Sequence, residues 1–161
     1  MLIVDSYSHF NGLEFMRIRR HDVLDELKLL VEKLEASDIV RPAQYSLVSR
    51  VQSGFASPRY HDQLTARDWH HASSTSIDCF EKDRMGLKFC FNLKAGNERP
   101  EFNDFCSRYR CDEIDLGIGL FPAERSEQNR GNTVFKTAVE TLKEGGRNCT
   151  VVPLALFAIE A

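Results

Sequence analysis

The stretch CTVVPLALFAIE, residues 149–160, is the feature that most limits the fold of this chain. It is almost wholly apolar and shows no alternation between apolar and polar residues. A strand with one buried face alternates, whereas a strand that is covered on both faces reads as a continuous apolar run. We therefore expect residues 149–160 to form a central strand of an α/β sheet.

The remaining segments are consistent with such a sheet. Residues 21–36 place apolar side chains on one stripe of an amphipathic helix, with Glu26 and Lys28 on a solvated face opposite. Further helices are predicted over 57–69, 100–111 and 132–146, and strands over 2–4, 76–80, 85–92 and 113–121. The glycines of GIG, 117–119, lie inside a strand pattern and indicate close packing rather than a phosphate-binding loop. This order predicts a single α/β domain over residues 1–161, with a mixed β-sheet flanked by helices.

The composition is that of a soluble globular protein. No apolar run approaches the roughly 18 residues that a membrane helix needs, so we expect no membrane segment, and we expect no signal peptide. The cysteine spacing matches neither a zinc motif nor a disulfide framework, which favours buried thiols in a reducing cytoplasm; the cysteines are Cys79, Cys90, Cys106, Cys111 and Cys149. A net charge of −3 argues against non-specific coating of nucleic acid, but it allows a local basic groove.

The segment SIDCFEKDRMGLKFCF, residues 76–91, is where hydrolytic chemistry is most readily placed. Two extended runs flank a charged turn, with Asp78 at the end of the first run and Lys88 in the second. Carboxylates on neighbouring strands can hold Mg²⁺, and a lysine on the same face can polarise the attacking water. The second run has no acid, so this pattern alone is a weak signal for a nuclease.

Three stretches together resemble type II restriction endonucleases of the BglII/BstYI group, which have the PD-(D/E)XK restriction-endonuclease-like fold. IVDSYSHFNGLEFM (3–16) resembles the group's N-terminal YSH-x-NGLE signature. EKDRMGLKFCF (81–91) is similar to the segment in which these enzymes carry K-D-R and then an apolar-E-apolar-Q-apolar strand. IDLGIGLFP (114–122) and VVPLALFAIE (151–160) resemble their closing strands. The resemblance implies a homodimer that binds double-stranded DNA at a short palindromic site with a GATC core and hydrolyses a phosphodiester bond with Mg²⁺.

The active-site motif departs from the group's pattern. The group's catalytic Glu falls on Lys88, the following Gln on Cys90, and the first-strand Asp on Cys79. A slip of one residue reverses the face of a strand, so Asp78 could replace that Asp only with a bulge. Lys88 puts a positive charge where a divalent cation would lie. On this resemblance, the candidate catalytic residues are Asp78, Lys88 and Glu14 of the NGLE block. The candidate metal ligands are Asp78 and Glu14.

Both segments also have a purely structural interpretation. Lys88 would pack its stem on the sheet and extend its amine to solvent or to Asp78. Asn11 would cap a helix that begins near Gly12, with Glu14 as its capping-box partner. The sequence therefore leaves the enzyme question open.

The DNA contacts implied by the resemblance follow the second active-site strand. The candidate side chains are Asn92, Lys94, Asn97 and Arg99. Asparagine can pair with adenine, and arginine or lysine can read guanine. Three functions remain: a site-specific nuclease, a catalytically inactive DNA-binding homologue (a pseudoenzyme), and a non-enzymatic dimeric scaffold.

Overall fold

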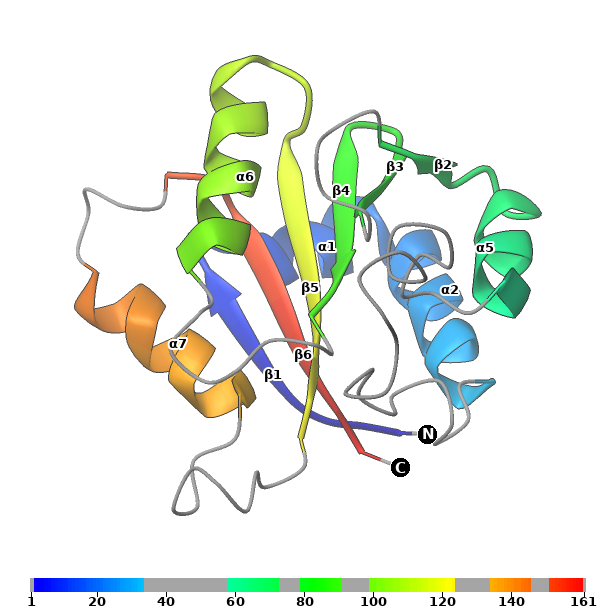
Figure 1. Ribbon diagram of the computed structural model, residues 1–161, viewed down its shortest axis with the longest axis horizontal. Helices are drawn as coiled ribbons and strands as arrows, with labels where there is room; N and C mark the ends of the chain where they lie inside the picture. Colours follow the sequence, from blue (N-terminus) through cyan, green and yellow to red (C-terminus); the bar gives the residue numbers. More distant parts are fainter. Residues whose placement is uncertain are drawn as a thin grey trace, which may run out of the picture.

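The computed structural model describes residues 2–33, 58–72, 79–90, 99–123, 134–145 and 151–160. In this part of the chain, six strands form one mixed sheet in the order β1-β6-β5-β4-β3-β2 (Figure 1). The strands are β1 (Leu2–His9), β2 (His70–His71), β3 (Cys79–Lys82), β4 (Met85–Phe89), β5 (Leu116–Pro122) and β6 (Leu154–Glu160). The helices are α1 (Gly12–Arg19), α2 (His21–Glu32), α5 (Pro58–Thr65), α6 (Arg99–Arg110) and α7 (Val134–Glu144).

Strand β6 lies inside the sheet, as its uninterrupted apolar sequence predicts. It pairs antiparallel with β1 and parallel with β5, and every residue of β6 before Glu160 is buried. Strand β5 continues in parallel to β4, whose five residues are also buried. Gly117 belongs to the close packing predicted for GIG, since a Cβ there would press on the Phe105 ring and on Leu154.

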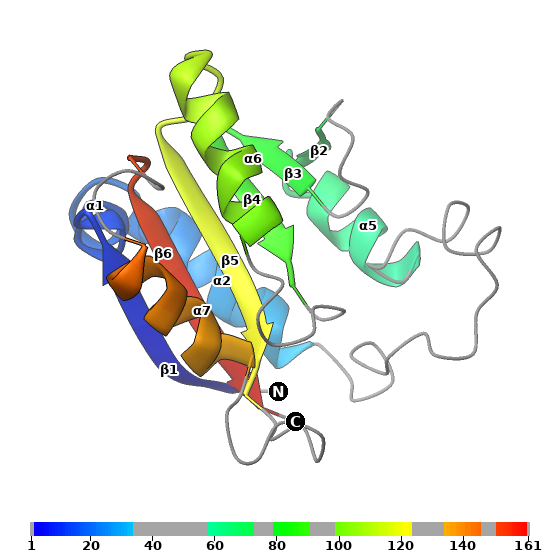
Figure 2. The ribbon, with the colours of Figure 1, turned by 60° about the vertical axis from the view of Figure 1, so that its left-hand side comes forward.

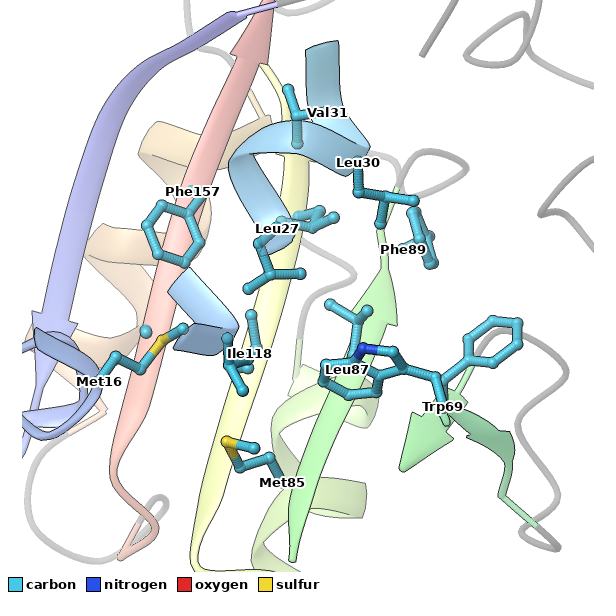
Figure 3. Packing of buried hydrophobic residues seen from close by; sticks show 14 of the residues in the cluster. Met16, Leu27, Leu30, Val31, Trp69, Met85, Leu87, Phe89, Ile118 and Phe157 are labelled. Atoms are coloured by element: carbon cyan, nitrogen blue, oxygen red, sulfur yellow. The ribbon is translucent and has the colours of Figure 1, made fainter. Parts of the chain in front are cut away.

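Helices cover both faces of the sheet. Figures 1 and 2 show α6 and α7 on one face and α1 and α2 on the other. One hydrophobic cluster joins α1, α2 and α5 to the sheet, and Figure 3 shows its centre around Leu27, Leu87 and Ile118. A second cluster joins α6 and α7 to the opposite face through Phe102, Phe105 and neighbours. The predicted α/β architecture with a helix-flanked mixed sheet is therefore confirmed.

The hairpin of β3 and β4 is confirmed, with a tighter turn than the sequence indicated. Asp83 and Arg84 have φ angles of 47° and 63°, so they form a two-residue connection of the kind that matches strand twist. Glu81 and Lys82, expected in the turn, belong to β3 instead. This register puts Cys79 directly opposite Lys88.

The N-terminal block differs from its predicted form. The first strand extends to His9 rather than ending near residue 4, and α1 begins at Gly12 as expected. Asn11 has a left-handed conformation and makes no capping hydrogen bond with its side chain. Ser8 caps the helix instead, because its Oγ accepts a hydrogen bond from the Leu13 amide at 3.2 Å.

Candidate functional site between β4 and α6

Lys88 is the centre of the candidate site. Strand alternation turns its side chain away from the Leu87 cluster and toward α6, where only 2% of it is exposed. Its Nζ donates a hydrogen bond to Glu101 Oε2 at 2.8 Å and lies 2.7 Å from Asp104 Oδ2. The same nitrogen stands 5.4 Å from the centre of the Phe105 ring. The amine is thus enclosed by a turn of α6 and is not free in solvent.

The ammonium group of Lys88 is held in its charged form. Burial by itself would lower the pKa of this amine, but the contacts with Asp104 and Glu101 outweigh burial and raise the pKa above its ordinary value. The two acids are spaced three residues apart, so both project from one side of α6. The side chain of Glu101 is 26% exposed and that of Asp104 is 22% exposed, whereas Lys88 is buried. Solvent therefore reaches the cluster at the two acids and not at the lysine.

A second buried cation, Arg108, lies beside Lys88. Its side chain is 4% exposed, and Nη1 donates a hydrogen bond to the Sγ of Cys79 at 2.7 Å. The guanidinium also pairs with Glu81 on β3 and with Glu113, whose Oε2 lies 3.3 Å from Nε. Burial raises the pKa of the Cys79 thiol to about 11 despite both cations, so the thiol is neutral.

The described residues of this cluster do not fit a divalent ion. A cation site for Mg²⁺ needs oxygen ligands that are free to turn toward the metal. Here the ammonium of Lys88 already lies between the Glu101 and Asp104 carboxylates. Across the described ranges, no group of three or more His, Cys, Asp or Glu side chains is arranged to hold a metal ion. The arrangement can lock α6 onto the hairpin, and it offers no free carboxylate pair.

Glu14 lies far from this cluster. It is on α1, which packs in the first cluster through Leu13 and Met16. The adjacent strand β1 is separated from β4 by β6 and β5, which corresponds to roughly 14 Å across the sheet. The hydroxyl of Ser8 donates to the Glu14 carboxylate and lowers the pKa of that group. The structure therefore does not bring Glu14 and Lys88 together.

Four of the other predicted site residues lie outside the described ranges, namely Asp78, Asn92, Lys94 and Asn97. Arg99 is the first residue of α6 and is exposed. It lies two residues before Glu101, so the Lys88 cluster fixes the turn of helix that carries it. Cys90, which follows β4, is buried in the second hydrophobic cluster.

The K-D-R sequence, residues 82–84, holds the hairpin in place and does not contribute to the Lys88 cluster. Lys82 Nζ pairs with Glu26 of α2 at 2.8 Å. Asp83 accepts a hydrogen bond from Arg20 at 2.8 Å. Arg84 binds Asp115 through two nitrogens, each at 2.8 Å, and it also binds Asp112. Lys82 thus ties the hairpin to α2, Asp83 ties it to the junction of α1 and α2, and Arg84 ties it to the segment between α6 and β5.

Glu26 was expected on a solvated face, and the structure corrects this. Its carboxylate accepts a hydrogen bond from the Trp69 indole at 2.7 Å and pairs with Lys82, and both charged side chains are only 17% exposed. Trp69 is fully buried. His70 and His71, just after it, form the exposed edge strand β2.

The acids of α6 were not among the site residues predicted from the sequence. Glu101 and Asp104 flank the apolar residues Phe102 and Phe105, which mark the buried side of the helix. Two acids at a spacing of three residues beside an apolar stripe are a signal for a buried cation partner. That signal, read together with a lone lysine in an apolar strand, could have identified the cluster.

Comparison with known proteins shows the fold of the chain. No protein-family model and no curated protein matches the sequence. None of the helices in the described ranges combines the length and apolar composition that a bilayer crossing requires. The crystal structure of free BglII matches with a TM-score of 0.61 and 16% identity, over 99% of this chain and 79% of that one. The mixed six-stranded sheet with flanking helices is thus the restriction-endonuclease-like fold.

Proposed function

We propose that this chain is a sequence-specific protein that binds double-stranded DNA as a homodimer and does not cut it efficiently. DNA binding is supported by the likeness of its fold to BglII and by the sequence resemblance, which is an argument by analogy. The single observation that carries the loss of cleavage is the enclosed ammonium of Lys88. A cation that forms ion pairs with both nearby carboxylates occupies the position in which the resemblance expects a metal-binding acid.

The proposed target is a short palindromic site, since two-fold symmetry of a dimer matches two-fold symmetry of DNA. Of the four candidate DNA contacts named after the second active-site strand, Arg99 is the one that lies within the described ranges. It is exposed and begins α6, whose next turn is bound to Lys88. Because the helix is anchored, the backbone that carries Arg99 is already ordered before binding. Asn92, Lys94 and Asn97 complete the proposed contact segment.

The test combines DNA binding with plasmid cleavage. Fluorescence anisotropy with a GATC-core duplex and a scrambled duplex, at several salt concentrations, should show site-selective binding that weakens as salt rises. Arg99→Ala should weaken binding about tenfold, which corresponds to about 1.4 kcal/mol. Arg110→Ala is the matched control, because Arg110 is an exposed arginine at the other end of the same helix.

Plasmid DNA incubated with Mg²⁺ or Mn²⁺ should stay intact at high protein concentration. Discrete fragments that disappear in Asp78→Ala would show instead that the chain is an active nuclease with divergent ligands. Absence of binding to both duplexes, with an intact dimer in sedimentation, would favour the scaffold function. Each outcome selects one of the three functions named from the sequence.

A further inference from the structure

We infer that the outer edge of β1 is the contact between two copies of this chain, with the two β1 strands paired antiparallel about a two-fold axis at Tyr7. Such pairing continues the sheet from one protomer into the other. This interface rests on the homodimer that the proposed function includes, and DNA takes no part in it.

The two edges of the sheet differ in their protection against strand pairing. An edge strand presents unpaired backbone N–H and C=O groups, and natural proteins usually protect such edges with short strands, lysines or prolines. One edge is β2, which has only two residues. The other edge is β1, which has eight residues and contains neither lysine nor proline. Among the described strands only β6 pairs with β1, which lies at the margin of the sheet in Figures 1 and 2.

The chain leaves β1 in the direction away from this outer edge. After His9 it turns into α1, and an added Cβ at Gly12 would overlap backbone atoms of Leu154. Leu154 belongs to β6, so α1 begins over the interior neighbour of β1. The start of α1 therefore does not lie along the outer edge of β1.

Residues 5–9 are the regular part of β1, because the pairing with β6 is irregular between Ile3 and Asp5. Their partners on β6 belong alternately to the two hydrophobic clusters, which assigns each residue to one side of the sheet. The α7 side carries Asp5, Tyr7 and His9, and the opposite side carries Ser6 and Ser8. A two-fold axis perpendicular to the sheet preserves these sides, so each residue faces a residue of the same side in the partner.

The segment DSYSH, residues 5–9, is self-complementary under this constraint. With the axis at Tyr7, each Asp5 faces the His9 of the partner, and each Ser6 faces a Ser8. A carboxylate opposite an imidazole is a stabilising cross-strand pair, whereas like charges directly opposite are destabilising. An axis at Asp5 would oppose the two carboxylates, and an axis at Ser6 or Ser8 would separate Asp5 from His9. Tyr7 is therefore the axis that the charges select.

The same axis brings together two apolar residues that are exposed in a single copy. Val4 precedes the regular segment and Phe10 follows it, and both are exposed. With the axis at Tyr7, Val4 of one copy comes opposite Phe10 of the other, at both ends of the segment. A β-branched residue opposite an aromatic one is a favourable cross-strand pair. Pairing of β1 with itself thus provides a contact for both exposed side chains.

A charge swap tests the Asp5–His9 pairs. Asp5→Lys and His9→Asp each remove two attractive pairs at once, so each should raise the dimer dissociation constant about tenfold in sedimentation equilibrium. The double variant Asp5→Lys/His9→Asp restores opposite charges across the interface and should return the constant to near the wild-type value. Glu32→Lys is the matched control, because it makes the same change of charge at an exposed position of α2.

Disulfide formation tests the position of the axis. Only a residue on the axis faces its own copy, at a Cβ separation of about 4.5–5.5 Å that is close to what a disulfide needs. In a background with Cys111→Ser and Cys149→Ser, Tyr7→Cys should form a covalent dimer under mild oxidation. Ser6→Cys should do so roughly tenfold more slowly, because it faces position 8 of the partner.

The outcomes separate this interface from the proposed function. A dimer that Asp5→Lys leaves unchanged, or that the double variant does not restore, would overturn the interface and leave the proposed homodimer in place. If circular dichroism shows that a charge variant is unfolded, the cross-link decides, and equal rates at positions 6 and 7 would overturn the interface. A monomeric wild type would overturn both the interface and the homodimer, whereas DNA binding is judged separately from the anisotropy of the two duplexes.

Discussion

The two faces of strand β4 are built on different principles. Met85, Leu87 and Phe89 join the cluster under α2 and α5, which consists of apolar side chains. The residues between them, Gly86 and Lys88, face α6 and its charged side chains. Successive residues of one short strand thus contribute to an apolar core on one side and to an ion-pair cluster on the other.

Depth of burial separates the lysines of the two faces. On the α2 face, Glu26 joins Trp69 and Lys82 at a site that keeps 17% exposure. On the α6 face, Lys88 is 2% exposed and is surrounded by protein. Complete burial of a charge is costly, and apolar replacement of an entire ion-pair group is often neutral for stability. The apolar α2 face is built as a core that stabilises the fold. The α6 face contains the buried ammonium of Lys88, which an apolar side-chain group could replace without loss of stability.

The sharpest test of this contrast is to place methionine at two neighbouring positions of β4, one on each face of the strand. Lys88→Met should destabilise the protein by about 3 kcal/mol, at the lower end for a broken buried pair because both acids are partly exposed. Leu87→Met, on the other face, conserves volume and should cost less than about 1.5 kcal/mol. Urea unfolding monitored by circular dichroism measures both.

The same experiment has an internal control. Adding Glu101→Gln and Asp104→Asn to Lys88→Met removes the unpaired carboxylates, so most of the lost stability should return. A Lys88→Met protein as stable as the wild type would mean that the α6 face is no more dependent on charge than the α2 face.

The next largest effect is expected at alkaline pH. Burial raises the folded-state pKa of Cys79 to about 11 from an ordinary value of 9.0. The thiol of the unfolded chain therefore ionises at a lower pH than the thiol of the folded chain. The contribution of Cys79 to the free energy of unfolding is complete below about pH 9 and is lost as the pH rises toward 11. The loss amounts to about 2–3 kcal/mol over that range.

Cys79→Ala should flatten this pH dependence relative to the wild type. Cys111→Ala, which changes an exposed cysteine, should leave it in place. Denaturant midpoints measured in steps from neutral pH to about pH 10.5 give the comparison. If the denaturant midpoint of Cys79→Ala depends on pH as steeply as that of the wild type, another group causes the pH dependence. The buried Cys79 thiol would then make no distinct contribution to the α6 face.

Features set by local periodicity could be predicted from the sequence. The continuous apolar run gave the internal strand β6, and the apolar stripe gave α2 with Val23, Leu27 and Leu30 buried. The glycines at 117 and 119 were correctly assigned to close packing, because a strand pattern surrounds them. In each case the neighbouring residues alone determine the environment.

Contacts between distant segments could not be predicted in this way. Glu26 looks like a surface residue until Trp69, 43 residues later, is placed beside it. Lys88 looks like a snorkelling lysine until α6 brings Glu101 over its amine. At the N-terminal turn, Asn11 has the preferred capping side chain, but its left-handed backbone leaves the capping to Ser8. Asp78 lies outside the described residues, and its role in the site stays a prediction.

On the α2 face, a smaller effect is expected from Glu26→Gln. The amide oxygen keeps an acceptor for the Trp69 indole, but the negative charge beside Lys82 is lost. We expect a loss of about 1 kcal/mol, since the pair is partly exposed. Tryptophan fluorescence reports on this site alone, because the chain has a single tryptophan. A loss as large as that of Lys88→Met would show that the two faces depend equally on buried charge.

The smallest effect is expected at the hairpin tip. Asp83→Asn removes the ion pair with Arg20, and asparagine tolerates the positive φ of this turn residue. Asp83 is 63% exposed, so the loss should be about 0.5 kcal/mol or less and should vanish at high salt. Urea midpoints at low and high salt measure it. A larger, salt-independent loss would mean that the tip holds the hairpin in place, so that the register of Cys79 and Lys88 depends on this surface contact as well as on the core.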